Sequence, residues 1–94
     1  MTHERWEVRA LYEERMQAQR LRREVGMEMF IIRCEAKVTL TALARELGVV
    51  VPHLIDMELG HRTYQDKYVD IAIIYCSKAM KRQKKLIKNQ NIKQ

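Results

Sequence analysis

The residues best suited to chemistry are two histidines and a glutamate, His53, Glu58 and His61, which lie close together in the sequence. Imidazole and carboxylate groups are the usual protein ligands of transition metals. Gly60 is expected to end a helix between the two histidines, so His53 and His61 do not share a helix face and we expect no metal site. The chain also lacks a Ser–His–Asp set, a glycine-rich phosphate loop and a pair of buried carboxylates. We therefore expect neither an enzyme nor a cofactor.

Helical patterns in the sequence supply the elements that would position these side chains. Thr39 is suited to cap a helix start with its hydroxyl, and Pro52 is tolerated only in a first helical turn. Gly48 and Gly60 are placed to end helices, and Gly26 interrupts the pattern near the N-terminus. About five helices are expected, at residues 3–24, 27–37, 40–47, 51–59 and 66–85.

The size and composition indicate one small all-α domain with terminal extensions. The chain has 94 residues, 47% of them hydrophobic, with three glycines and one proline, which is too few turn residues for a sheet protein. The expected division is an N-terminal helical extension at 1–25, a central domain at 26–77 and a basic C-terminal extension at 78–94. No stretch has the length and apolarity of a membrane span or signal peptide, so a cytoplasmic protein is expected. Cys34 and Cys76 lie in apolar runs and are expected to be reduced core residues.

Positive charge is concentrated in the last quarter of the sequence. The formal net charge is +6, and all 12 acidic residues precede residue 71. The cations beyond that point are Lys78, Lys81, Arg82, Lys84, Lys85, Lys88 and Lys93. This tail either follows a phosphate backbone or is a solvated helix end whose cations favour the helix dipole.

The stretch LARELGVVVPHLIDMELGHR, residues 43–62, has the spacing of a helix-turn-helix. Ala44 is small where two helices would cross closely, and Gly48 permits a tight turn. Val49 would fill the space between the helices, and Leu54 and Met57 would anchor the second helix in the core. Leu54 and Met57 would lie on the face opposite Val51 and Ile55.

A longer pattern resembles the Cro/CI repressor-like helix-turn-helix family, also called the XRE family. The matching positions, within about residues 29–75, are Ile32-Arg33, Thr39, Leu43-Ala44, Leu47-Gly48-Val49, Leu54, Asp56-Met57-Glu58, Gly60 and Arg62. The resemblance implies a DNA-binding domain in which Glu58 is structural and supports the following loop. It also implies that the groove-facing side chains are Val50, Val51, Pro52, His53, Ile55 and Asp56.

The residues at these groove-facing positions differ from the polar side chains that usually contact bases. Val51, Pro52 and Ile55 can touch a thymine methyl group, but only His53 and Asp56 could hydrogen-bond to a base edge. Contacts to phosphate are expected from His61, Arg62, Thr63 and Tyr64 in the following loop, or from Arg45 and Lys37. Alternatively, Val50, Val51, Pro52 and Ile55 form an exposed apolar patch that binds a protein.

Two functions follow from these alternatives. The first is a small transcriptional regulator that binds double-stranded DNA as a homodimer and acts by occupying a promoter or operator. Its dimer contacts would come from the N-terminal or the last helix. The second is a protein-binding inhibitor of the phage or mobile-element type, which keeps the scaffold and binds a host protein with little sequence-specific DNA binding.

Overall fold

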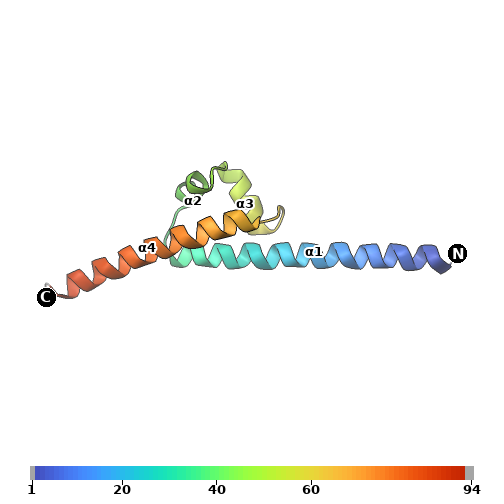
Figure 1. The fold of residues 1–94 in the computed structure, drawn as a ribbon, viewed down its shortest axis with the longest axis horizontal. Coiled ribbons are helices and arrows are strands. Elements are labelled where there is room, and N and C mark those ends of the chain that lie inside the picture. The colour runs from blue at the N-terminus through green and yellow to red at the C-terminus, as the bar shows by residue number, and fades with distance from the viewer. Residues whose placement is uncertain (1, 93–94) are drawn as a thin grey trace.

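A computed structural model describes the backbone of residues 2–92 and the side chains of residues 5–86. This part of the chain contains four α-helices and no strand: α1 (Thr2–Glu35), α2 (Leu40–Leu47), α3 (Val51–Leu59) and α4 (Asp66–Ile92). In Figure 1, α2 and α3 lie on one side of the two long helices, α1 and α4, which run in the same direction. None of the described helices is long and apolar enough to cross a membrane.

The expected break at Gly26 is wrong, because α1 continues through this residue without interruption. A glycine inside a helix costs only about 1 kcal/mol relative to alanine, and tertiary packing can offset that cost. Gly26 is buried where α1 crosses α3, and a Cβ atom at this position would collide with the carbonyl oxygens of Met57 and Glu58. The glycine therefore allows two helices to approach closely, and the two expected N-terminal helices are a single helix.

Local signals define the ends of the helices between α1 and α4. The Thr39 hydroxyl accepts a hydrogen bond from the Ala42 amide at 3.1 Å, which confirms the expected cap of α2. Gly48 and Gly60 end α2 and α3 with φ values of 73° and 79°. Pro52 lies in the first turn of α3, whose N-cap Val50 provides no side-chain hydrogen bond. Helix α1 ends at Glu35. In the turn that follows, Lys37 is a non-glycine residue with a left-handed φ of 56°.

The core lies between α2, α3 and the overlapping parts of α1 and α4. Leu43, Leu54, Met57 and Cys76 are its largest fully buried side chains. The other buried hydrophobic residues are Met29, Ala36, Val38, Ala44, Leu47, Tyr64 and Ala72. The expectation of two core cysteines is correct for Cys76, but Cys34 is exposed because it lies on the face of α1 that points away from the core.

Both long helices extend beyond this core in opposite directions (Figure 1). The molecule measures 77 × 24 × 17 Å. From residue 5 to residue 18, every side chain of α1 is exposed, including Trp6 and Tyr12. At the other end, the Gln83 side chain donates a 2.6 Å hydrogen bond to the Ala36 carbonyl, so α4 passes the end of α1 near Gln83. The expected divisions at 25/26 and 77/78 therefore each fall inside a continuous helix.

Candidate functional site

Helix α3 is held against the rest of the molecule by apolar contacts and one ion pair. Leu54 and Met57 are fully buried, as expected. The guanidinium of Arg33 donates to both carboxylate oxygens of Glu58, at 2.7 and 3.1 Å, and to the Val38 carbonyl at 3.0 Å. The hydrogen bond to Glu58 is the largest influence on the pKa of Arg33, which is raised. Glu58 is therefore structural, and its partner is Arg33 on α1 rather than the following loop.

The outward face of α3 is mostly apolar. Val50 is 68% exposed, Ile55 36% and Leu59 55%, and Pro52 is also exposed. The expected exposure of Val51 alongside Ile55 is only partly correct, because Val51 is half-buried against the core. Val51 lies one turn before Leu54, on the edge of the buried face. Leu59, and not Val51, lies beside Ile55 on the outward face. Leu59 follows Ile55 by four residues, a helical spacing that is visible in the sequence.

Asp56, a candidate base contact, is bound to the loop that follows α3. Its carboxylate lies 3.5 Å from Nε of Arg62 and 3.9 Å from Nδ1 of His61, which is charged only when protonated. Its carbonyl accepts hydrogen bonds from the amides of His61 and Arg62, at 2.8 and 3.2 Å. The loop thus folds back on the end of α3, and the Asp56 charge is partly balanced before any ligand binds.

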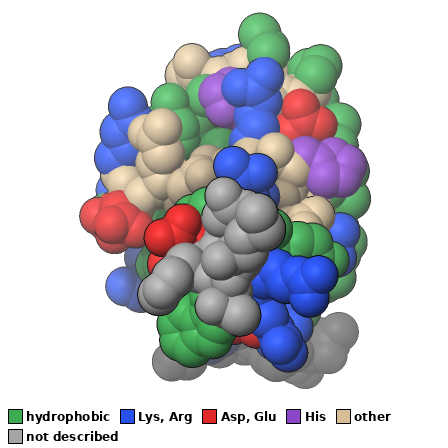
Figure 2. Space-filling model, turned by 90° about the vertical axis from the view of Figure 1, so that its right-hand side faces the viewer, with side chains coloured by type: hydrophobic (Ala, Val, Ile, Leu, Met, Phe, Trp, Pro, Cys, Tyr) green, Lys and Arg blue, Asp and Glu red, His purple; other side chains and the backbone are tan. Residues whose placement is uncertain are grey.

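A shallow polar depression lies beside α3, where the loop meets α1. Its lining residues are Arg22, His53, His61, Arg62, Thr63 and Gln65. Figure 2 views the molecule from its N-terminal end and shows the two described histidines among basic and acidic side chains. His53 is half-buried, with its ring edge-on to Tyr68 at 6.4 Å between centroids. The structure thus brings His53, His61, Arg62 and Thr63 together.

Two residues of this depression were not predicted. Gln65 lies two residues after Thr63 in the same loop, and its polar side chain is only a weak signal in the sequence. Arg22 comes from α1, more than thirty residues away in the chain, and no local pattern indicates its position. It supplies a cation that, unlike Arg62, forms no ion pair with another residue of the range 5–86.

Three other candidate phosphate contacts lie outside this depression. Tyr64 is only 4% exposed, so the expectation that it contacts phosphate is wrong. Burial is the main cause that raises the pKa of its hydroxyl, and the Glu58 carboxylate adds to the shift. Lys37, just before α2, and Arg45, near the end of α2, are exposed and do not line the depression. Of the tail cations, Lys88 and Lys93 lie outside the described side chains.

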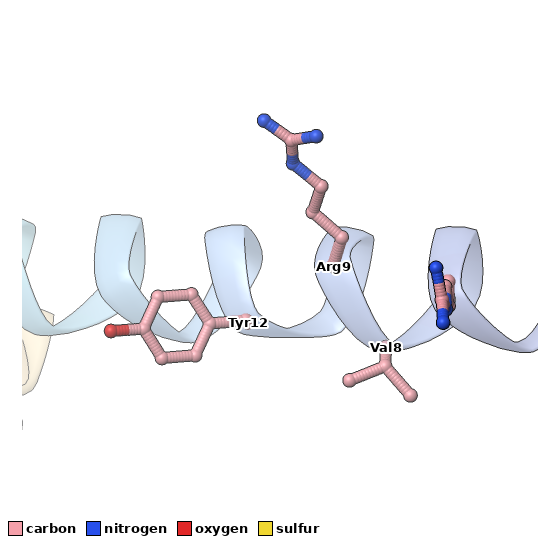
Figure 3. Close-up of a pocket in the computed structure, with 4 residues that line it drawn as sticks. Val8, Arg9 and Tyr12 are labelled. Carbon is pink, nitrogen blue, oxygen red and sulfur yellow. The ribbon is translucent and has the colours of Figure 1, made fainter.

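The surface hollows lined by α1 alone do not enclose a ligand. One of them, near the N-terminus, is lined by Arg5, Val8, Arg9 and Tyr12, all from α1. Figure 3 shows Val8 and Arg9 pointing to different sides of this single helix. Side chains from one helix cannot surround a small molecule on all sides. Within the described side chains, no group of three or more His, Cys, Asp and Glu residues is placed to hold a metal ion.

Comparisons with protein-family models, curated proteins and solved structures found no match for this chain.

Proposed function

We propose that this chain is a small DNA-binding transcriptional regulator of the Cro/CI repressor-like type, which acts by occupying an operator. In this proposal α2 and α3 form a helix-turn-helix, and α3 enters the major groove. The observation that carries the proposal is the depression beside α3, where Arg22 from α1 joins Thr63 and Gln65 from the loop. Donors beside the end of a groove-bound helix are suited to contact the phosphate backbone, which supports the proposal.

The outward face of α3 determines what such a protein could recognise. Pro52, Ile55 and Leu59 offer no hydrogen-bond donors, so they would discriminate bases by apolar contact with thymine methyl groups. Asp56 is engaged with Arg62 and His61, which leaves His53 as the polar side chain nearest to a base edge. We therefore propose a preference for A·T-rich sites, with Arg45 and Lys37 as additional phosphate contacts near α2.

Fluorescence anisotropy with labelled duplexes tests this proposal. Arg22→Ala should weaken binding to all duplexes alike and make the salt dependence shallower by about one unit of slope. Arg20→Ala is the matched control, because Arg20 lies two residues away and lines a different hollow of α1. If Arg20→Ala and Arg22→Ala have the same effect, the depression is not a phosphate site.

A double substitution of Ile55 and Leu59 by serine tests base recognition in the same assay. It should lower the affinity for A·T-rich duplexes more than the affinity for G·C-rich duplexes. Removal of residues 81–94 tests the basic tail: a shallower salt slope would place the tail on the phosphate backbone, and an unchanged slope would make it a solvated helix end.

A second function, binding of a host protein as an inhibitor, is favoured by the exposure of Pro52, Ile55 and Leu59 on the outward face of α3 and of Val50 at its N-cap. Clustered exposed apolar residues often mark a protein interaction site. For this function, DNA binding would be weak and insensitive to sequence. The serine substitutions would then leave DNA binding unchanged and abolish the complex with the protein partner.

A further inference from the structure

One side of α1 carries a continuous row of polar side chains. Its members are spaced alternately three and four residues apart, so they share one helix face. They are Arg5, Val8, Tyr12, Arg15, Gln19 and Arg22, and all but Val8 can donate a hydrogen bond through the side chain. All of these side chains are at least partly exposed, with Tyr12 at 64%. We call these residues the donor row.

The positive charge of the donor row is not balanced within α1. A carboxylate three or four residues away on a helix can pair with an arginine, as Glu13 does with Arg9 at 3.6 Å. Arg5, Arg15 and Arg22 have no acidic residue at either spacing. The acidic residues between Arg5 and Arg22 lie about 110–130° around the helix from the middle of the row. They are Glu7, Glu13 and Glu14.

The donor row lies on the side of α1 that faces α3 and its loop. Gly26, four residues after Arg22, continues the spacing of the row and packs against the backbone of α3. Arg22 itself lines the depression beside α3. At the next residue, α1 passes so close to the loop that a Cβ atom on Gly60 would lie 2.7 Å from the Cα atom of Arg23. The row therefore begins at the candidate phosphate site.

From this site the donor row leads away from the core. In Figure 1, α1 continues past the end of the core at which α3 and its loop lie. At 1.5 Å per residue, the row extends about 26 Å from Arg22 to Arg5. Arg9 is not part of it and points to a different side of the helix from Val8 (Figure 3). A long ligand that occupies the depression therefore has a row of donors beside its continuation.

We propose that the donor row contacts the phosphate backbone of the same duplex that α3 enters, an inference that rests on the function proposed above. One chain then covers more DNA than its helix-turn-helix does. Phosphates follow one another about every 3.4 Å along each strand, so a strand that leaves the depression presents further acceptors. Arginine, glutamine and tyrosine side chains are common donors to phosphate. Because these contacts do not reach base edges, they add affinity without adding sequence preference.

Continuity with the depression favours DNA over an acidic protein as the occupant of the row. A protein bound along the row would compete with the duplex at Arg22, which lines the depression and is also the first member of the row. A single duplex contacts both surfaces without such competition. The unbalanced charges of Arg5 and Arg15 are also of the kind that a polyanion neutralises with release of its counterions.

Fluorescence anisotropy of the full chain with a labelled A·T-rich duplex of about 30 base pairs, between about 0.05 and 0.2 M salt, tests the proposal. Arg5→Ala/Arg15→Ala should make the salt dependence shallower by about two units of slope, because each lost phosphate contact removes about one unit. The matched control is Arg9→Ala/Arg20→Ala, which removes the same charge but lies about 90–110° around the helix from the row. The control should leave the slope nearly unchanged.

A DNA-cleaving iron chelate attached to a cysteine tests for proximity rather than charge. The chelate is placed in the row by Val8→Cys and on the opposite side of α1 by Ala10→Cys. Both variants carry Cys34→Ser, because Cys34 is exposed whereas Cys76 is buried. The chelate at position 8 should cut the bound duplex several-fold more than the chelate at position 10. Circular dichroism melting of every variant shows that the differences do not reflect unfolding.

The outcomes separate this proposal from the function on which it rests. If the wild-type chain does not bind the duplex, the proposed function fails and the role of the donor row fails with it. If the wild-type chain binds and the slope depends on Arg22 but not on Arg5 and Arg15, only the role of the row is overturned, and the row is a solvated or protein-binding surface. Equal effects of the two double variants, or equal cutting by the two chelates, would also overturn it.

Discussion

Helix α1 runs through two regions with different surroundings. Its N-terminal arm, residues 2–21, is exposed to solvent, whereas the rest of the helix lies in the packed centre of the molecule. In the centre, α1 touches α3 so closely that Gly26 has no room for a Cβ atom. In the arm, Trp6, Val8, Leu11 and Tyr12 are all more than half exposed. The same helix therefore derives its stability from tertiary packing in one region and from local interactions in the other, such as the Arg9–Glu13 pair at 3.6 Å.

The largest effect on stability is expected for Gly26→Ala. Alanine is the better helix former, but its methyl group would meet two backbone carbonyls of α3 that cannot move without shifting the helix. We expect a loss of about 3 kcal/mol or more in the free energy of unfolding, measured by urea denaturation. Ala18→Gly in the arm is the control and should cost about 1 kcal/mol or less. Equal effects at the two positions would show that the close crossing is not needed.

The next effect concerns the Arg33–Glu58 pair, whose side chains are only 11% and 7% exposed. Glu58→Ala would leave the Arg33 guanidinium without its carboxylate in a mostly dry environment. The expected cost is about 2 kcal/mol in the free energy of unfolding. Glu14→Ala in the arm should change the stability by about 0.5 kcal/mol or less, because Glu14 is exposed. A small loss for Glu58→Ala would indicate that water readily replaces the carboxylate.

A smaller effect, with the opposite sign, is expected at the boundary between α1 and α2. Lys37 adopts a left-handed conformation, which costs a residue with a Cβ atom about 1 kcal/mol but costs glycine nothing. Lys37→Gly should therefore raise the melting temperature, whereas Lys37→Ala should leave it nearly unchanged. Differential scanning calorimetry distinguishes the two, and a lower melting temperature for Lys37→Gly would contradict the prediction.

The smallest expected effect is on the pH dependence of stability, to which the buried Cys76 should contribute and the exposed Cys34 should not. Burial raises the pKa of the Cys76 thiol above its ordinary value of 9.0. The folded state therefore holds this proton more tightly than the unfolded state does. The resulting stability is complete below pH 9.0 and is lost as the pH rises through the folded-state pKa. Cys76→Ala should make the decline of stability above this pH shallower, and Cys34→Ser should not, as measured by thermal melts at alkaline pH.

Those parts of the fold that depend on local chemistry could be predicted from the sequence. Thr39, Gly48, Pro52 and Gly60 define helix ends through their own hydroxyl, ring or φ angle, and the expected bounds of α2 and α3 agree with the structure. The role of Gly26 could not be predicted, because a glycine can mark either a helix break or a close helix crossing. The structure favours the crossing through the backbone of Met57 and Glu58.

The candidate site shows the same limit. His53, His61, Arg62 and Thr63 follow one another in the sequence, so their common location could be anticipated. Arg22 could not, because its position depends on how α1 packs against α3. The burial of Tyr64 likewise results from tertiary contacts that a loop sequence does not reveal.

The close crossing at Gly26 has a mechanical consequence. Because α1 is one unbroken helix, the arm and the surface of α1 that contacts α3 form a lever with its pivot near Gly26. At 1.5 Å per residue, the start of α1 lies about 36 Å from Gly26, so a tilt of about 10° at the pivot corresponds to a displacement of about 6 Å at the tip of the arm. A partner that bends or restrains the arm would thereby exert torque on α3, at a distance and without touching it.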